Sequence, residues 1–194
     1  MATKREQREQ TSAALRTTAR RLFAEHGYAH VGLETIAQAA GVTKGALYHH
    51  FSSKAVLFRH VLADVQNEVG EQVQRVAEAQ PDCWSYLVEG CRAFLDASTH
   101  PDIQRIMLID GPAVLGWNDW RALDEQSSAR LLTEALTTLI AAGTIPPQPV
   151  EPLARLLSGA VNEAALWLAQ SGNTATDRDA TIAALTRMLD SLRE

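Results

Sequence analysis

The chain has 194 residues, of which 46% are hydrophobic and 21% charged, an ordinary composition for a globular protein. No stretch approaches the roughly 18 uninterrupted apolar residues of a membrane-spanning helix, so we expect no membrane partner. The first residues are charged and no apolar segment follows them, which argues against a secretory signal. Cys83 and Cys91 are the only cysteines, too few for a disulfide framework, and we expect a cytoplasmic protein.

Charge is distributed unevenly along the chain, although the net charge is only −5. Residues 1–60 contain 9 Lys and Arg against 4 Asp and Glu, whereas residues 61–194 contain 9 against 19. This asymmetry favours a basic, polyanion-binding end joined to an acidic body with a different role. Ordinary variation between segments is the alternative explanation for a difference of this size.

Apolar residues recur with helical periodicity, and no alternating run predicts a strand. We therefore expect an all-α protein of about nine helices. These are expected over residues 9–26, 33–40, 44–51, 54–80, 83–97, 102–109, 118–143, 151–171 and 177–193. Asp110, Gly111 and Pro112 are expected to end the sixth helix, and Gly116 to form a further turn.

Two short expected helices flank Gly41, which is the layout of a helix-turn-helix. At about 100° per residue, Leu47 and Phe51 of the second helix face the core, whereas Gly45 and His49 face outward. A glycine costs helix stability, and its functional interpretation is that it lets the backbone approach a DNA groove closely. The alternative is a helical corner with a purely structural role.

The segment from Ile36 to Phe51, with Lys54 and Leu57 after it, resembles the amino-terminal domain of the TetR family of bacterial transcriptional regulators. The resemblance is specific over about residues 16–62 and only architectural beyond them. It implies a helix-turn-helix DNA-binding domain over residues 1–60 and a helical ligand-binding and dimerisation domain over residues 61–194. Gly32 departs from the family pattern, in which a Ser or Thr usually caps this helix.

The resemblance also implies which side chains meet DNA. Thr35 and Lys54 match phosphate-contacting positions, and His50 matches a position at the edge of the DNA backbone. The positions of the second helix that face the major groove are Thr43, Lys44, Gly45, Tyr48 and His49.

All four tryptophans lie in the second domain, where they could line an apolar cavity with polar anchors. The alternative is that they fill a helical core. The candidate ligand-binding residues are Trp84, Phe94, Met107, Asp110, Trp117, Trp120, Asn162, Glu163 and Trp167.

The last two expected helices carry apolar residues on more than one face, and those of the final helix follow the spacing of a coiled-coil seam. We expect them to form a four-helix interface in a homodimer, with packing inside one subunit as the alternative. The candidate interface residues are Leu153, Leu157, Ala160, Ala164, Leu168, Ile182, Leu185, Leu189 and Leu192.

No metal or other cofactor is expected, because His26 and His30 straddle Gly27 and no histidine pair shares a helical face with a carboxylate. The sequence also lacks a phosphate-binding loop and a serine-hydrolase motif, so we do not expect an enzyme. The prediction is a ligand-responsive repressor that binds a palindromic DNA operator as a homodimer, with an unidentified small-molecule effector. The alternatives are a ligand that acts as co-repressor and a sequence-neutral DNA-binding protein.

Overall fold

The computed structural model describes residues 3–172 and 174–193, and over these residues it contains helices and no strand, which confirms the all-α prediction. Eleven α-helical segments follow one another in this part of the chain. They are α1 (Lys4–His26), α2 (Leu33–Ala39), α3 (Lys44–His50), α4 (Lys54–Glu78), α5 (Cys83–Ser98), α6 (Pro101–Gln104), α7 (Gly111–Leu115), α8 (Trp117–Asp124), α9 (Ser128–Ala141), α10 (Val150–Gln170) and α11 (Thr174–Asp190).

Helix α1 begins five residues earlier than the periodicity indicated. Thr3 and Glu6 form a capping box, in which Thr3 Oγ1 accepts from the Glu6 N–H at 3.2 Å and a Glu6 carboxylate oxygen accepts from the Thr3 N–H at 2.7 Å. The added first turns are polar and exposed, so they contribute nothing to the apolar pattern.

The expected break at Asp110, Gly111 and Pro112 is wrong. The chain stays helical from α6 to α7 through a π-helical segment, Arg105–Asp110. Pro112 is the second residue of α7, and the helix continues through it although it has no N–H to donate. Gly111 is needed for close packing, because a Cβ there would lie 2.8 Å from Cδ1 of Trp120. The turn does form at Gly116, which has φ of +79°.

The helix expected over residues 118–143 is two helices, α8 and α9. The chain turns between them, where the Ser127 N–H donates to the Asp124 carbonyl at 3.0 Å. This turn packs against Gly70 of α4, whose hypothetical Cβ would lie 3.3 Å from that of Ser127. The apolar pattern continues on both sides of this turn, so hydrophobic periodicity could not reveal it.

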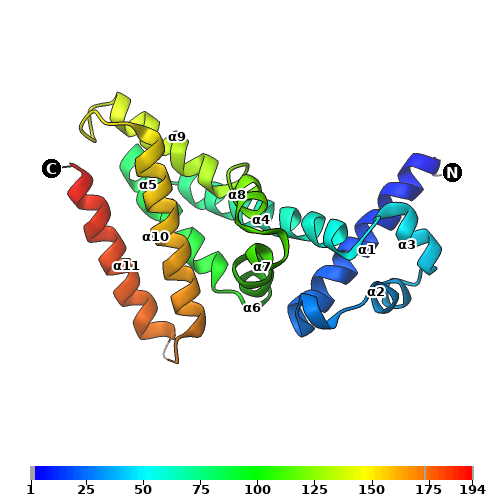
Figure 1. Cartoon of the computed structure of the whole chain (residues 1–194). Coiled ribbons are helices and arrows are strands. Elements are labelled where there is room, and N and C mark those ends of the chain that lie inside the picture. Colours follow the sequence, from blue (N-terminus) through cyan, green and yellow to red (C-terminus); the bar gives the residue numbers. More distant parts are fainter. Residues whose placement is uncertain (1–2, 173, 194) are drawn as a thin grey trace.

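Figure 1 shows an elongated molecule in which α1, α2 and α3 form one end and α10 and α11 lie toward the other. Helix α4 passes from the first group into the second and packs on α5 and α9. The amino-terminal group closes around the rings of Phe23, Tyr28 and Phe58, whose centroids lie 5.0 to 5.6 Å apart. Leu47 and Phe51 are buried in this core, as the helical wheel predicted.

Candidate DNA-binding surface and effector pocket

The helix-turn-helix is formed by α2, a turn at Gly41 with φ of +69°, and α3. Thr43 caps α3, and its Oγ1 accepts from the Ala46 N–H at 3.2 Å. A Cβ added at Gly45 would meet nothing within 4 Å, so the backbone there faces open space. Tyr48 is 47% exposed, whereas its neighbour Leu47 is fully buried. Helix α3 therefore presents one open polar face.

Six of the eight expected DNA-contacting residues are exposed, and the other two, His50 and Lys54, are half-buried. Thr43, Lys44 and His49 are exposed on α3, and Thr35 is exposed in the first turn of α2. The Lys44 ammonium pairs with the Glu34 carboxylate of α2, and this hydrogen bond raises the pKa of Lys44. This ion pair holds the Lys44 side chain against α2.

Lys54 has a structural role that the resemblance did not indicate. Its Nζ donates to the backbone carbonyls of Tyr28 at 2.8 Å and Val31 at 3.0 Å, and lies 4.1 Å from the centre of the Tyr28 ring. The lysine thus ties the start of α4 to the turn after α1. At the edge of the same surface, burial lowers the pKa of His50, and the positive charge of Arg8 lowers it further.

Contacts join this unit to the carboxy-terminal body. Arg20 of α1 forms ion pairs with Glu68 and with Asp102, the latter at 3.1 Å. The Tyr28 N–H donates to Asp110 Oδ2 at 2.9 Å. The π-helical segment packs on both α1 and α4. This segment is therefore in contact with both α1 and the helix that leaves the amino-terminal unit.

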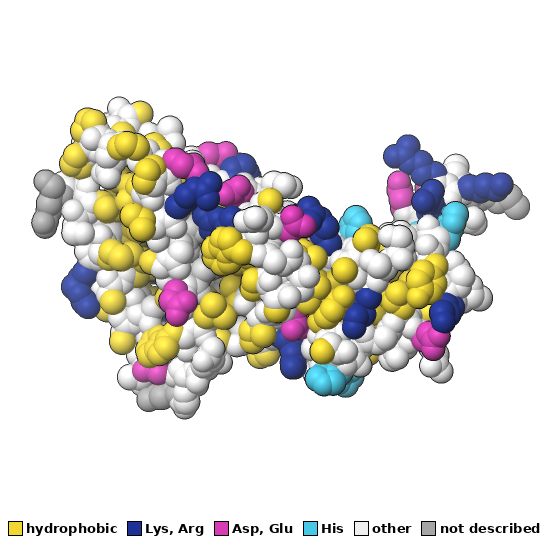
Figure 2. All heavy atoms as spheres, viewed as in Figure 1, with side chains coloured by type: hydrophobic (Ala, Val, Ile, Leu, Met, Phe, Trp, Pro, Cys, Tyr) yellow, Lys and Arg dark blue, Asp and Glu magenta, His cyan; other side chains and the backbone are white. Residues whose placement is uncertain are grey.

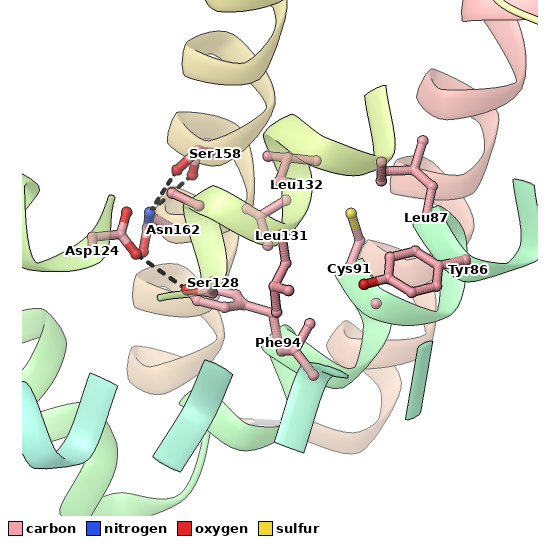
Figure 3. Close-up of a pocket in the computed structure, with 15 residues that line it drawn as sticks. Tyr86, Leu87, Cys91, Phe94, Asp124, Ser128, Leu131, Leu132, Ser158 and Asn162 are labelled. Atoms are coloured by element: carbon pink, nitrogen blue, oxygen red, sulfur yellow. Dashed lines mark hydrogen bonds between the residues drawn. The ribbon is translucent and has the colours of Figure 1, made fainter. Parts of the chain in front are cut away.

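A pocket lies in the body between α5, α9 and α10, with Val73 of α4 in its wall (Figure 3). It encloses about 460 Å³ of space free of atoms, its mouth included. Polar side chains gather at one end, and the remaining lining is largely apolar. The lining residues are Val73, Tyr86, Leu87, Gly90, Cys91, Phe94, Asp124, Ser128, Ala129, Leu131, Leu132, Ala135, Ser158, Val161 and Asn162.

The polar end is organised around Asp124, which is 3% exposed. Its carboxylate accepts from Arg121 at 3.2 Å and from Ser128 Oγ at 3.1 Å. Burial raises the pKa of Asp124, and the positive charge of Arg121 opposes this effect. Elsewhere in the wall, burial raises the pKa of the Cys91 thiol to about 12, so this cysteine stays protonated at neutral pH.

Of the nine expected ligand-binding residues, only Phe94 and Asn162 line this pocket; the other seven lie outside it. Trp120 is buried and its Nε1 donates to the Met107 carbonyl at 2.7 Å, so this pair fills the core, as the alternative interpretation held. The other five candidates are exposed or make contacts outside the pocket. Trp117, Trp167 and Glu163 are exposed, the Arg193 guanidinium stacks on Trp84, and Asp110 holds Tyr28.

The expected dimer residues are divided between the inside and the outside of the protomer. Ile182, Leu192 and Ala164 are half-buried. The other leucines of the expected interface are buried in the protomer's own core: Leu153, Leu157, Leu168, Leu185 and Leu189. The seam of α11 thus packs within one chain. Ala160 is exposed on α10, as are Leu156, 73% exposed, and Trp167, 51% exposed, the latter expected in the ligand site. Yellow side chains gather over this end of the molecule in Figure 2.

Two further searches bear on function. Over residues 3–172 and 174–193, no group of three His, Cys, Asp or Glu side chains is placed to hold a metal ion. Within the same described ranges, none of the helices combines the length and the apolar character needed to cross a bilayer.

Comparison with known proteins identifies the class of protein that this architecture represents. A family model described as bacterial regulatory proteins of the tetR family matches residues 15–61, and one described as the C-terminal domain of tetracyclin repressor-like proteins matches residues 84–192. A TetR-family transcriptional regulator from Pectobacterium atrosepticum has a TM-score of 0.83 and 32% identity, with 99% of this chain and 98% of that chain covered. The chain belongs to the TetR family of bacterial regulatory proteins.

Relatives with assigned roles match part of the chain. The HTH-type transcriptional regulator TtgR of Pseudomonas putida is 36% identical over 78 residues, which cover 40% of this chain and 37% of TtgR. The HTH-type transcriptional repressor AcnR of Corynebacterium efficiens is 31% identical over 125 residues, covering 60% of this chain and 62% of AcnR. The matches span less than two thirds of both relatives.

Proposed function

We propose that this protein is a cytoplasmic, ligand-responsive repressor that binds a palindromic DNA operator as a homodimer. The observation that carries the proposal is the open face of α3, where Gly45 has free space above its backbone and Tyr48 projects outward. The surrounding residues 1–60 carry an excess of basic side chains, which suits the phosphate backbone.

The homodimer would form through the exposed side of α10 and α11. Leu156 and Trp167 leave a large apolar area open on α10, and Met188 adds to it on α11. A two-fold axis through this face would place the two α3 helices on the same side of one assembly. Such a dimer reads two half-sites whose centres lie roughly 34–36 Å apart.

The pocket between α5, α9 and α10 would hold the effector. Helix α4 contributes Val73 to the pocket and begins beside α3, so one rigid element connects both sites. The ion pairs of Arg20 and the hydrogen bond from Tyr28 to Asp110 form a second connection. We take residues 1–60 as the DNA-binding domain and residues 61–194 as the effector-binding and dimerisation domain. Effector binding that alters the spacing of the two α3 helices would release the operator.

Selection of binding sites from random DNA by the purified protein, at about 150 mM salt, tests this function. Enrichment of one inverted repeat is expected. Lys44→Ala and Tyr48→Ala should lose the preference for that repeat and keep the dimeric mass, because neither residue contributes to the core or to α10. Binding without sequence preference, or a monomeric wild-type protein, would refute the proposal.

A further inference from the structure

Asn162 holds an unsatisfied hydrogen-bond acceptor in the wall of the pocket. The residue is 8% exposed, and its Nδ2 donates to the backbone carbonyl of Ser158 at 3.0 Å. This bond fixes the orientation of the amide, because a flipped amide would set two acceptor oxygens against each other. Oδ1 is left buried and has no hydrogen-bond partner among the described residues. Buried acceptors of this kind are rare in folded proteins and call for an explanation.

The charges beside Asn162 already compensate one another. Asp124 is buried and pairs at 3.2 Å with Arg121, whose side chain is 12% exposed, and Arg121 also donates to Ser158 Oγ at 2.8 Å. An added cation would be repelled by Arg121 and an added anion by Asp124, with little water present to screen either. The unfilled position at this end of the pocket is therefore suited to a neutral hydrogen-bond donor.

The rest of the lining determines the size and polarity of the ligand that the pocket can accept. Away from the polar end the wall consists mostly of aliphatic side chains and the ring of Phe94, with Tyr86 and Cys91 on the opposite side (Figure 3). The free space of about 460 Å³ includes the mouth, so the enclosed part suits a ligand of one small ring.

We propose that this pocket binds a neutral, single-ring apolar molecule that donates an O–H or N–H hydrogen bond to Asn162 Oδ1. The inference rests on the proposed function, in which this pocket is the effector site. The ring lies against Phe94 and the leucines, and its donor fills the place of the missing partner. Asn162 thereby determines specificity, because a ring without a donor leaves its oxygen buried and unpaired.

Calorimetric titration of the full-length protein with phenol, aniline, anisole and toluene tests this inference. Phenol and aniline are neutral donors, whereas anisole and toluene have similar rings without a donor. Phenol or aniline is expected to bind at least tenfold more tightly than anisole or toluene. The comparison of phenol with aniline distinguishes a hydroxyl from an amino ligand.

Asn162→Leu removes the amide but keeps the branching and the number of side-chain heavy atoms, and it is expected to bring phenol and toluene to within about twofold of each other. Asn67→Leu makes the same change on an exposed turn of α4 and should keep the wild-type preference. Equal affinity for all four rings, no binding of any ring, or an unchanged preference in Asn162→Leu overturns the inference. If Asn162→Leu fails to fold, the titration of the wild-type protein with the four rings is itself the test of the inference.

These titrations contain no DNA, so their failure is separable from failure of the proposed function. A protein that selects an inverted repeat but shows no donor preference contradicts only the ligand class. A protein that prefers donors but selects no DNA sequence contradicts only the proposed repressor function.

Discussion

The backbone N–H of Tyr28 donates to Asp110 Oδ2 at 2.9 Å and joins the turn after α1 to the end of the π-helical segment. The two residues are 82 positions apart in the chain. This bond connects a backbone group of the DNA-binding unit to a side chain of the body. Together with the ion pairs of Arg20, it fixes the angle between the two parts.

Asp110→Ala is expected to lower the free energy of unfolding by about 1–2 kcal/mol, because it removes a charge-assisted hydrogen bond and leaves a partly buried N–H unpaired. Urea denaturation followed by circular dichroism measures the change. Asp119→Ala is the control, since its ion pair with Arg59 is exposed on both sides and should contribute less than about 0.5 kcal/mol. Equal effects of the two substitutions would show that Asp110 does not hold the interface.

Gly45→Ala is expected to change stability and DNA affinity in opposite directions. Its Cβ meets nothing within 4 Å, so the alanine should stabilise α3 by about 0.5–1 kcal/mol. The same methyl group would stand between α3 and the DNA and weaken operator binding. Thermal unfolding and fluorescence anisotropy with the selected operator measure the two effects. Unchanged operator affinity would mean that this backbone does not approach the groove.

Trp167→Glu is expected to dissociate the homodimer, because it places a charge on the exposed apolar side of α10. Sedimentation velocity at micromolar concentration should show a monomer that has lost high-affinity operator binding. Trp117→Glu provides a comparison on another helix: Trp117 is 62% exposed and lies on α8, where its ring centre is 5.0 Å from that of Trp120. A dimeric Trp167→Glu variant would exclude α10 as the interface.

Cys91 and Cys83 are expected to differ in reactivity. Burial raises the pKa of Cys91 to about 12, whereas Cys83 is exposed, so iodoacetamide at pH 8 should alkylate Cys83 alone. Mass spectrometry of the native protein reads the site of modification.

The same pKa has a consequence for folding. An unperturbed cysteine thiol has a pKa of 9.0, so the unfolded chain releases this proton first as pH rises. The contribution of Cys91 to stability should be complete below about pH 9 and decline above it, toward pH 12. Cys91→Ala should flatten this part of the stability profile; a profile identical to that of the wild type would contradict the burial of the thiol.

The helix-turn-helix could be predicted from the sequence, because the residues that determine its fold are close together in the chain. The spacing of Leu47 and Phe51 settles which side of α3 is buried, and the position of Gly45 on the opposite side follows from helix geometry. Lys54 was assigned to phosphate from the resemblance alone. Its bonds to two carbonyls of a preceding turn depend on tertiary structure that spacing does not encode.

The pocket was harder to predict because its wall draws on α4, α5, α9 and α10, whose mutual rotation is set by packing. Asn162 was a good candidate, since it is polar within an apolar stripe. The tryptophans were misleading: the indole N–H of Trp120 finds a carbonyl partner inside the core. The seam of Leu185 and Leu189 was equally ambiguous, because seam spacing does not specify whether the partner helix belongs to the same chain.

Because of the π-helical segment, the number of residues at this point of the chain determines how the two parts of the molecule are oriented. A π-turn takes in an extra residue compared with an α-turn, and one residue corresponds to about 100° of rotation about the helix axis. Removing one residue from Arg105–Asp110 would restore an ordinary helix and swing the Asp110 carboxylate away from Tyr28. Relatives that differ by a single insertion or deletion at this point would thus hold their DNA-reading helices at different angles, even with every pocket residue unchanged.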